Sequence, residues 1–163
     1  MDLFSIAGEF DIGEKILHID PFGDGHINRT FLVKTEREDR SYILQNINRN
    51  VFHDISGLMQ NIDIVLTHLI HKKRDWQSDH LLMVPAIHKT RGGDLYHEGP
   101  EKDAWRCFTF IPGGITYQKI SDPLLAKESG RIIGQFQTLL ADLKEPLNIT
   151  IESFHDILFR LKQ

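Results

Sequence analysis

The sequence predicts an α+β fold, in which a mainly antiparallel sheet of about five strands with one packed helix is followed by further helices. Three observations lead to this prediction. Short β-branched and aromatic segments separated by turn residues fill the first 50 positions, apolar residues recur at helical spacing after Val51, and Pro112-Gly113-Gly114 then separates the last strand from a helical stretch.

Composition excludes several classes of protein. The 163 residues are 40% hydrophobic and 26% charged, which is ordinary for a domain that buries a core without staples, and the formal charge of −4 provides no basic field for nucleic acid. Cys107 is the one cysteine, so no intrachain disulfide forms. Because the sequence has no secretory signal and no apolar run of roughly 20 residues, we expect a cytoplasmic protein without membrane or nucleic-acid partners.

The strands are predicted from extended segments that end at glycine, proline or charged turns. A Gly-Asp-Gly turn follows the first segment, and the polar run 36–40 separates the second from the third, so these connections are short enough for antiparallel pairing. The expected strands are residues 14–22, 29–35, 41–48, 81–90 and 104–111.

Helices are predicted where apolar residues recur three and four positions apart. One spans about 55–72, and a second starts after Asp122, a capping residue, with Pro123 at its first position. An amphipathic segment, 151–161, closes the chain. We expect three parts: an N-terminal lobe (1–111), a linker (112–116) and helices of a second lobe (117–163).

The loop Gly23-Asp24-Gly25-His26-Ile27-Asn28 lies between two predicted strands. Glycines let a backbone approach phosphate oxygens, and free N–H groups can bind them. A dinucleotide-binding loop would open a helix, and a P-loop would need Gly-Lys-Ser/Thr, so neither motif fits. Taken alone, however, a Gly-Asp-Gly hairpin is more often an ordinary turn.

Six blocks in order resemble the aminoglycoside phosphotransferase-like family, which has a protein-kinase-like fold, and within it the N-acetylhexosamine 1-kinase-like branch. The resemblance spans residues 13–161. The blocks are GDGHINRTFLV, SYILQNINRNVFHD, GLMQNIDIVLTHL, RCFTFIPGGITYQKI, SGRIIGQFQTLLADL and IESFHDILFRL.

The resemblance implies a kinase N-terminal lobe that binds ATP. The glycine loop would cover the phosphates, and the backbone of the segment before Pro112 would contact the adenine edge. The residues implied to form this site are Gly23, Asp24, Gly25, His26 and Asn28 in the loop, Leu17 and Ile43 beside the adenine, Gln45 on the third strand, and Phe108, Thr109, Phe110 and Ile111 in the hinge.

The chain departs from protein kinases at one charged position. Protein kinases have a lysine on the third strand that pairs the phosphates and a helix glutamate. Here these positions correspond to Gln45 and Gln60, which are both neutral. Arg29 and Lys34 on the second strand are candidate substitutes, although charges on strands are usually just solvated.

No catalytic or metal-binding residue is predicted. Phosphoryl transfer in this fold needs a catalytic Asp followed by an Asn, and a second Asp for Mg²⁺. No Asn follows the His-Asp pair His155-Asp156 at the required spacing, and a packing or capping role is expected for this pair. We therefore expect a truncated chain that is inactive alone, with Mg²⁺ bound only in a full-length parent.

Two functions remain open from the sequence. One is the ATP-binding portion of a small-molecule phosphotransferase that acts on a sugar or amino-sugar hydroxyl, with the acceptor bound in the full-length parent. The other is a non-catalytic, pseudokinase-like binding or regulatory module. In either case the apolar faces of the helices after Pro123, including Leu139, Leu158 and Leu161, are expected to be exposed and to favour self-association.

Overall fold

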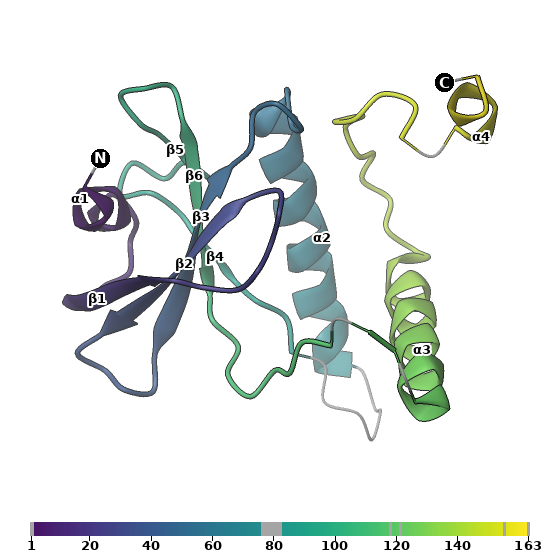
Figure 1. The fold of residues 1–163 in the computed structure, drawn as a ribbon, viewed down its shortest axis with the longest axis horizontal. Helices are drawn as coiled ribbons and strands as arrows, with labels where there is room; N and C mark the ends of the chain where they lie inside the picture. Colours follow the sequence, from purple (N-terminus) through teal and green to yellow (C-terminus); the bar gives the residue numbers. More distant parts are fainter. Residues whose placement is uncertain (1, 76–82, 118, 121, 155, 163) are drawn as a thin grey trace.

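The structure, a computed structural model, describes residues 2–75, 83–117, 119–120, 122–154 and 156–162. It is an α+β fold in which one antiparallel sheet has helix α1 on one side and α2 and α3 on the other (Figure 1). The strands are β1 (Ile16–Pro21), β2 (Arg29–Thr35), β3 (Ser41–Ile47), β4 (Ile87–His88), β5 (His97–Glu98) and β6 (Ala104–Thr109). The helices are α1 (Leu3–Gly8), α2 (Ile55–Asp75), α3 (Pro123–Leu140) and α4 (Ile157–Arg160).

The strand order is β1-β2-β3-β6-β4. Strand β5 lies off this path and pairs with β6. The first three strands and β6 confirm the predicted segments. The predicted strand 81–90 is shorter than expected: only β4 and an isolated bridge from Thr90 to Phe10 pair, and residues 81–82 lie outside the described residues. Pro85 accounts for this difference, because a proline cannot donate a ladder hydrogen bond.

Strand alternation gives the sheet two different faces. On the α1 face, the side chains of Val33, Leu44 and Cys107 are fully buried. Helix α1 and the residues after it cover this face, with Phe10 at 0% exposure. The sequence patterns missed α1, because six residues are too few to show a helical period, and a helix of that length depends on tertiary packing.

On the α2 face, burial is complete only near α2. Ile47 and Ala104 pack there against Ile55 and Met59 of the helix. The Asp54 carboxylate accepts a hydrogen bond from the Gly57 backbone N–H (2.8 Å) and so caps the first turn of α2. The rest of this face is only half-buried, so part of the sheet surface beside α2 remains accessible to solvent.

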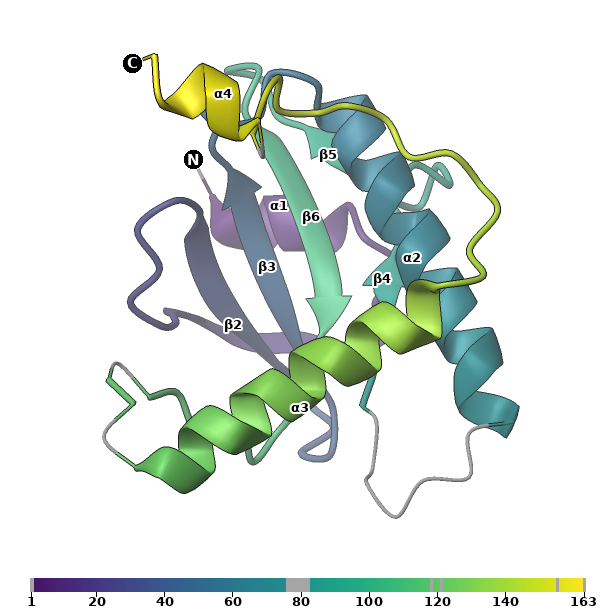
Figure 2. The same cartoon turned by 90° about the vertical axis from the view of Figure 1, so that its right-hand side faces the viewer.

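Helix α3 packs against α2 rather than against the sheet, and Figure 2 shows it crossing in front of the strands. Its predicted start is confirmed, because Asp122 accepts from the Leu124 N–H (2.8 Å) with Pro123 at the first position. Leu139, predicted to be exposed, is buried at 2% exposure, and its carbonyl lies 3.0 Å from His68 Nε2 on α2.

The predicted helix 151–161 is wrong in length. Among the described residues of that range, only α4 is helical, because Ser153 has a left-handed φ of 52° and Asp156 caps a new start by accepting from the Phe159 N–H (3.0 Å). The capping role predicted for the His155-Asp156 pair is therefore confirmed for Asp156, while His155 lies outside the described residues. In the described ranges, no helix is long and apolar enough to cross a bilayer.

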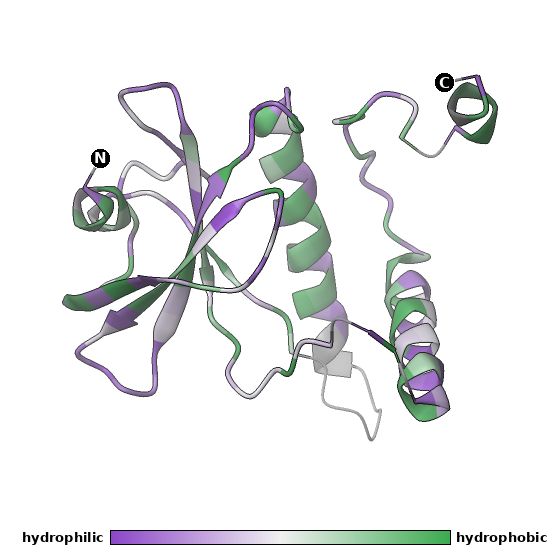
Figure 3. Cartoon of the chain, in the orientation of Figure 1, coloured by the Kyte–Doolittle hydropathy of each residue, from purple (hydrophilic) through white to green (hydrophobic). Residues whose placement is uncertain are grey.

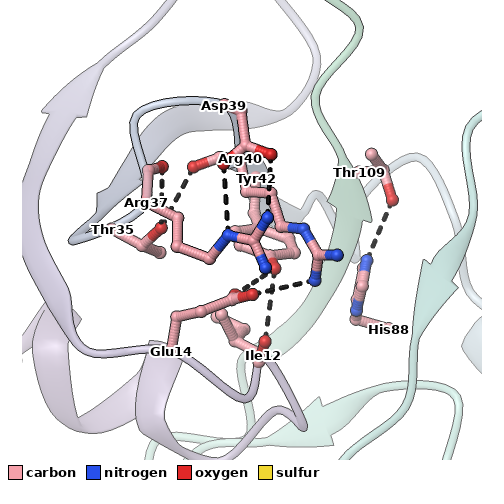
Figure 4. Close-up of polar contacts among 9 residues, drawn as sticks. All are labelled: Ile12, Glu14, Thr35, Arg37, Asp39, Arg40, Tyr42, His88 and Thr109. Carbon is pink, nitrogen blue, oxygen red and sulfur yellow. Dashed lines mark hydrogen bonds and ion pairs between the residues drawn. The ribbon is translucent and has the colours of Figure 1, made fainter.

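A polar cluster ties the turn between β2 and β3 to the segment just before β1 (Figure 4). The buried Tyr42 hydroxyl donates to the Glu14 carboxylate, which also accepts from Arg40 at 2.9 Å. Burial, followed by the hydrogen bond to Glu14, raises the pKa of Tyr42 to about 12. Arg40, in the polar run 36–40 between β2 and β3, is thus tied to Glu14, just before β1.

The Tyr42→Phe substitution should destabilise the fold by about 1.5–3 kcal/mol, because it removes a buried hydrogen bond to a charged group. Urea unfolding measures this loss. Tyr96→Phe is the matched control, since its hydroxyl has no hydrogen-bond partner in the described part of the chain, and it should change stability by less than about 0.5 kcal/mol. Equal effects of the two substitutions would contradict the role of the cluster.

Hydrophobic residues recur along α3 and α4 (Figure 3), and several of their side chains are exposed. Ile133 is 59% exposed, Phe136 46% and Leu158 71%. We expect the chain to self-associate through these helices, because monomers rarely leave apolar patches above a few hundred Å² in water. In light scattering after size exclusion, Phe136→Lys should shift the chain towards monomer and Gln137→Lys should not. A monomeric wild-type chain would contradict this expectation.

Candidate functional site

The predicted glycine loop projects from the β1–β2 hairpin towards the side of the sheet where α2 and α3 lie (Figure 1). Its base is closed by a hydrogen bond from the Phe22 N–H to the Thr30 carbonyl (2.9 Å). Gly23 has a φ of +75°, a conformation that favours glycine. A Cβ added at Gly25 would meet nothing closer than a backbone oxygen at 3.9 Å, so the chain itself leaves space there.

The loop residues differ in their contacts with the rest of the chain. Gly23, Asp24, Gly25 and His26 are exposed and free to face a ligand. The half-buried Asn28 instead accepts a hydrogen bond from the Asn48 N–H (3.1 Å), so its side chain fixes the end of the loop to the end of β3. We infer that Asn28 stabilises the conformation of the loop through this hydrogen bond.

The predicted hinge follows the last residue of β6, at the end of the sheet where β3 begins. The N–H of Thr109 already donates to Ala86 and the N–H of Phe110 to Ser41, both at 2.9 Å. Within the described chain, the Ile111 N–H has no hydrogen-bond partner, so the backbone available for an adenine edge begins at Ile111. Phe22, next to the glycine loop, packs edge-to-face on Phe110 with ring centroids 5.4 Å apart.

Between loop and hinge, the α2 face carries two rows of side chains across adjacent strands. The apolar row consists of Leu32, Ile43 and Phe108, which pair directly in the β2–β3–β6 register. All three side chains are half-buried. Ile43 therefore lies on an apolar surface of a kind suited to one face of an aromatic base, and its place beside the adenine stays a prediction.

Leu17 lies at an irregularity of β1, and its role beside the adenine stays a prediction. The register of β1 shifts between Ile16 and His18, so Leu17 has no partner on β2, and its side chain is 44% exposed. The structure thus places Ile43, but not Leu17, within the apolar row.

The polar row is the next row along the same strands and consists of Thr30, Gln45 and Arg106. Gln45 Nε2 donates to Thr30 Oγ1 (2.9 Å), and Arg106 Nε donates to Gln45 Oε1 (3.0 Å). Gln45 therefore bonds to a cation on the neighbouring strand. It does not pair with Gln60, whose amide contacts Ser56 and Asn148.

Arg106 places a cation next to Gln45, on the strand that neighbours the third strand. Burial lowers the pKa of Arg106 to about 10, so the guanidinium remains charged at neutral pH. Neither predicted substitute lies there: the Arg29 guanidinium stacks over Phe31 on the other face, and Lys34 is exposed beyond the apolar row. Sequence reasoning missed Arg106, although a charge inside the strand AWRCFT was a signal, because charged residues are rarely buried without a reason.

Residues 18–146 match the family model described as APH, the phosphotransferase enzyme family. The chain belongs to the phosphotransferase enzyme family.

A spectinomycin phosphotransferase, solved in complex with ADP and spectinomycin, has a similar fold. The match has a TM-score of 0.50 at 12% sequence identity and covers 88% of this chain. The chain spans only 38% of the length of that enzyme. The likeness supports the protein-kinase-like fold of this family member.

A cavity of about 230 Å³ lies beside the hinge of this phosphotransferase-family chain, but on the α1 face. Its lining includes Tyr42, His88 and Thr109, and His88 Nε2 lies 2.9 Å from the Thr109 hydroxyl (Figure 4). The β6 strand separates this cavity from the two rows. Cys107, in the same strand, is fully buried, and burial raises its thiol pKa to about 12, so it acts as a core residue.

The His88→Gln substitution should reduce the loss of stability on mild acidification. Burial lowers the pKa of folded His88 below its ordinary value of 6.5. The unfolded chain therefore binds more protons as the pH falls through 6.5, and the free energy of unfolding declines. Glutamine removes this proton uptake while keeping a polar group near Thr109.

The measurement is the urea midpoint at pH 7.5 and at pH 5.5. The difference between the two midpoints should be smaller in His88→Gln than in the wild type. His18→Gln, at an exposed position of β1, should behave like the wild type. An unchanged difference in His88→Gln would show that His88 does not contribute to acid sensitivity.

Proposed function

We propose that this chain is the nucleotide-binding part of a phosphotransferase that moves the γ-phosphate of ATP to a hydroxyl of a sugar or amino sugar. The observation that carries the proposal is the α2 face, where an apolar row lies between an exposed glycine loop and a hinge with an unpaired backbone N–H. Membership in the phosphotransferase family and the ADP bound by the spectinomycin enzyme support a nucleotide ligand.

In this proposal each part of the α2 face has one task. The apolar row covers one face of the adenine, and the Ile111 N–H donates to its edge. The backbone N–H groups of Gly23–Asn28 point to the phosphates, where glycines leave room for close approach. The edge-to-face contact of Phe22 with Phe110 holds the start of the loop near the hinge.

The acceptor is proposed from the resemblance of the six sequence blocks to N-acetylhexosamine 1-kinases. Amino-sugar hydroxyls are weakly acidic, so transfer requires a base and charge stabilisation at the γ-phosphate. Asp156 is occupied in capping α4, so we assign it no part in that step. We propose that the present chain binds nucleotide but transfers no phosphate by itself.

Mg²⁺ does not fit the part of the chain that the structure describes. No group of three His, Cys, Asp or Glu side chains comes together there in a way that could hold a metal ion. Asp24 in the glycine loop is a single exposed carboxylate, whereas Mg²⁺ prefers octahedral oxygen ligation. We therefore derive no step through the metal from these residues.

The Gly25→Val substitution should weaken ADP binding by about tenfold or more, equivalent to about 1.4 kcal/mol, because the added side chain occupies space used by the phosphates. The chain itself has room for a Cβ at Gly25, so folding should be preserved. Isothermal titration with ADP and with adenosine measures the effect, and adenosine affinity should change little.

Gly130→Val is the matched control, because Gly130 lies exposed on α3 with no atom near a built Cβ. It should leave ADP affinity as in the wild type. Unaltered ADP binding by Gly25→Val would mean that the loop is an ordinary hairpin turn. Absence of nucleotide binding by the wild-type chain would overturn the proposed function.

A further inference from the structure

Arg106 is a largely buried cation without a counter-ion in the described part of the chain. No carboxylate among those residues lies within ion-pair distance of its guanidinium, and burial is the one cause that shifts its pKa. A buried charge is costly unless it is paired, so it is normally found with an anion.

The contacts of Arg106 hold the guanidinium in place without neutralising it. Its Nε donates to Gln45 Oε1 at 3.0 Å, and one terminal nitrogen lies 3.9 Å from Met59 Sδ, a weak acceptor. Its central carbon lies 5.2 Å from the centre of the Phe108 ring. Of the five N–H donors of an arginine, three remain without a partner in the described chain.

The position of Arg106 relates it to the two ends of the proposed site. It belongs to the row adjacent to Ile43 and Phe108, two residues or about 6.8 Å further along the strands. Thr30, the other end of this row, follows the glycine loop by two positions. A nucleotide whose base covers the apolar row would carry its phosphates past Arg106 towards that loop.

We propose that the Arg106 guanidinium binds the phosphate oxygens of the nucleotide, taking the role that a third-strand lysine has in protein kinases, and that Gln45 is its positioning residue. This inference rests on the proposed function. A guanidinium presents parallel N–H groups that match phosphate oxygens, which a neutral glutamine on β3 cannot do. Gln45 bridges Thr30 and Arg106, so it fixes the direction in which those donors point.

The Arg106→Gln substitution separates this role from a structural one. We expect it to weaken ADP binding about tenfold or more while adenosine affinity changes less than about twofold. The urea midpoint of the ligand-free chain should stay the same or rise, because an unpaired buried charge is removed. Arg106→Lys, which keeps a charge but not the paired donors, should bind ADP with intermediate affinity.

Arg29→Gln is the matched control, because it removes the same charge from β2, which β3 separates from β6, and on the α1 face. It should leave both affinities unchanged. A second variant, Gln45→Glu, tests the phosphate role of Arg106 by giving the guanidinium a counter-ion within the chain. It supplies the missing carboxylate next to Arg106, so it should raise the urea midpoint and weaken ADP relative to adenosine.

The outcomes distinguish this inference from the proposed function. Wild-type ADP affinity in Arg106→Gln would overturn the phosphate role while the nucleotide site stands. Equal affinity of the wild type for ADP and adenosine would also overturn the phosphate role. A lower urea midpoint in Arg106→Gln with parallel losses of ADP and adenosine would show a structural arginine. No binding of either ligand by the wild type would overturn both proposals.

Discussion

The pairing of β3 with β6 is the constraint on which both faces of the molecule depend. Its register sets Leu44 opposite Cys107 on the α1 face and Gln45 opposite Arg106 on the α2 face. Because side chains alternate along a strand, a slip of one residue would move the Arg106 charge into the core beside Phe10. The burial of the α1 face therefore determines where the cation lies on the other face.

Stability and the proposed ligand binding depend on different faces of the sheet. On the α1 face, helix α1 and the chain to Ile12 close a core whose main members are fully buried, and the Tyr42–Glu14–Arg40 cluster ties its edge. The α2 face is closed only where Ile47 and Ala104 contact α2. An unpaired guanidinium on that half-covered face lowers stability, and the apolar burial on the opposite face offsets its cost.

Sequence patterns predicted the elements that have a clear period and missed those that depend on distant contacts. The bounds of β2 and the starts of α2 and α3 follow from local residues such as Asp122 and Pro123. Helix α1 could not be predicted, because it is held by contacts such as the hydrogen bond from Arg91 Nε to the Gly8 carbonyl (2.8 Å). The polar row was missed for a related reason: Gln45 and Arg106 are 61 positions apart, and only the strand register makes them neighbours.

Because the cation lies on β6 and not on the third strand as in protein kinases, its relation to helix α2 also differs. In protein kinases an ion pair between strand and helix makes the site depend on the position of the helix. Here, among the described residues of α2, Arg106 contacts the sulfur of Met59, and Gln60 bonds to Asn148. Asn61 also exchanges hydrogen bonds with the Asn148 backbone at 2.7 and 2.9 Å. The charged group of the proposed site is therefore set by the sheet, while α2 is anchored to the segment that follows α3.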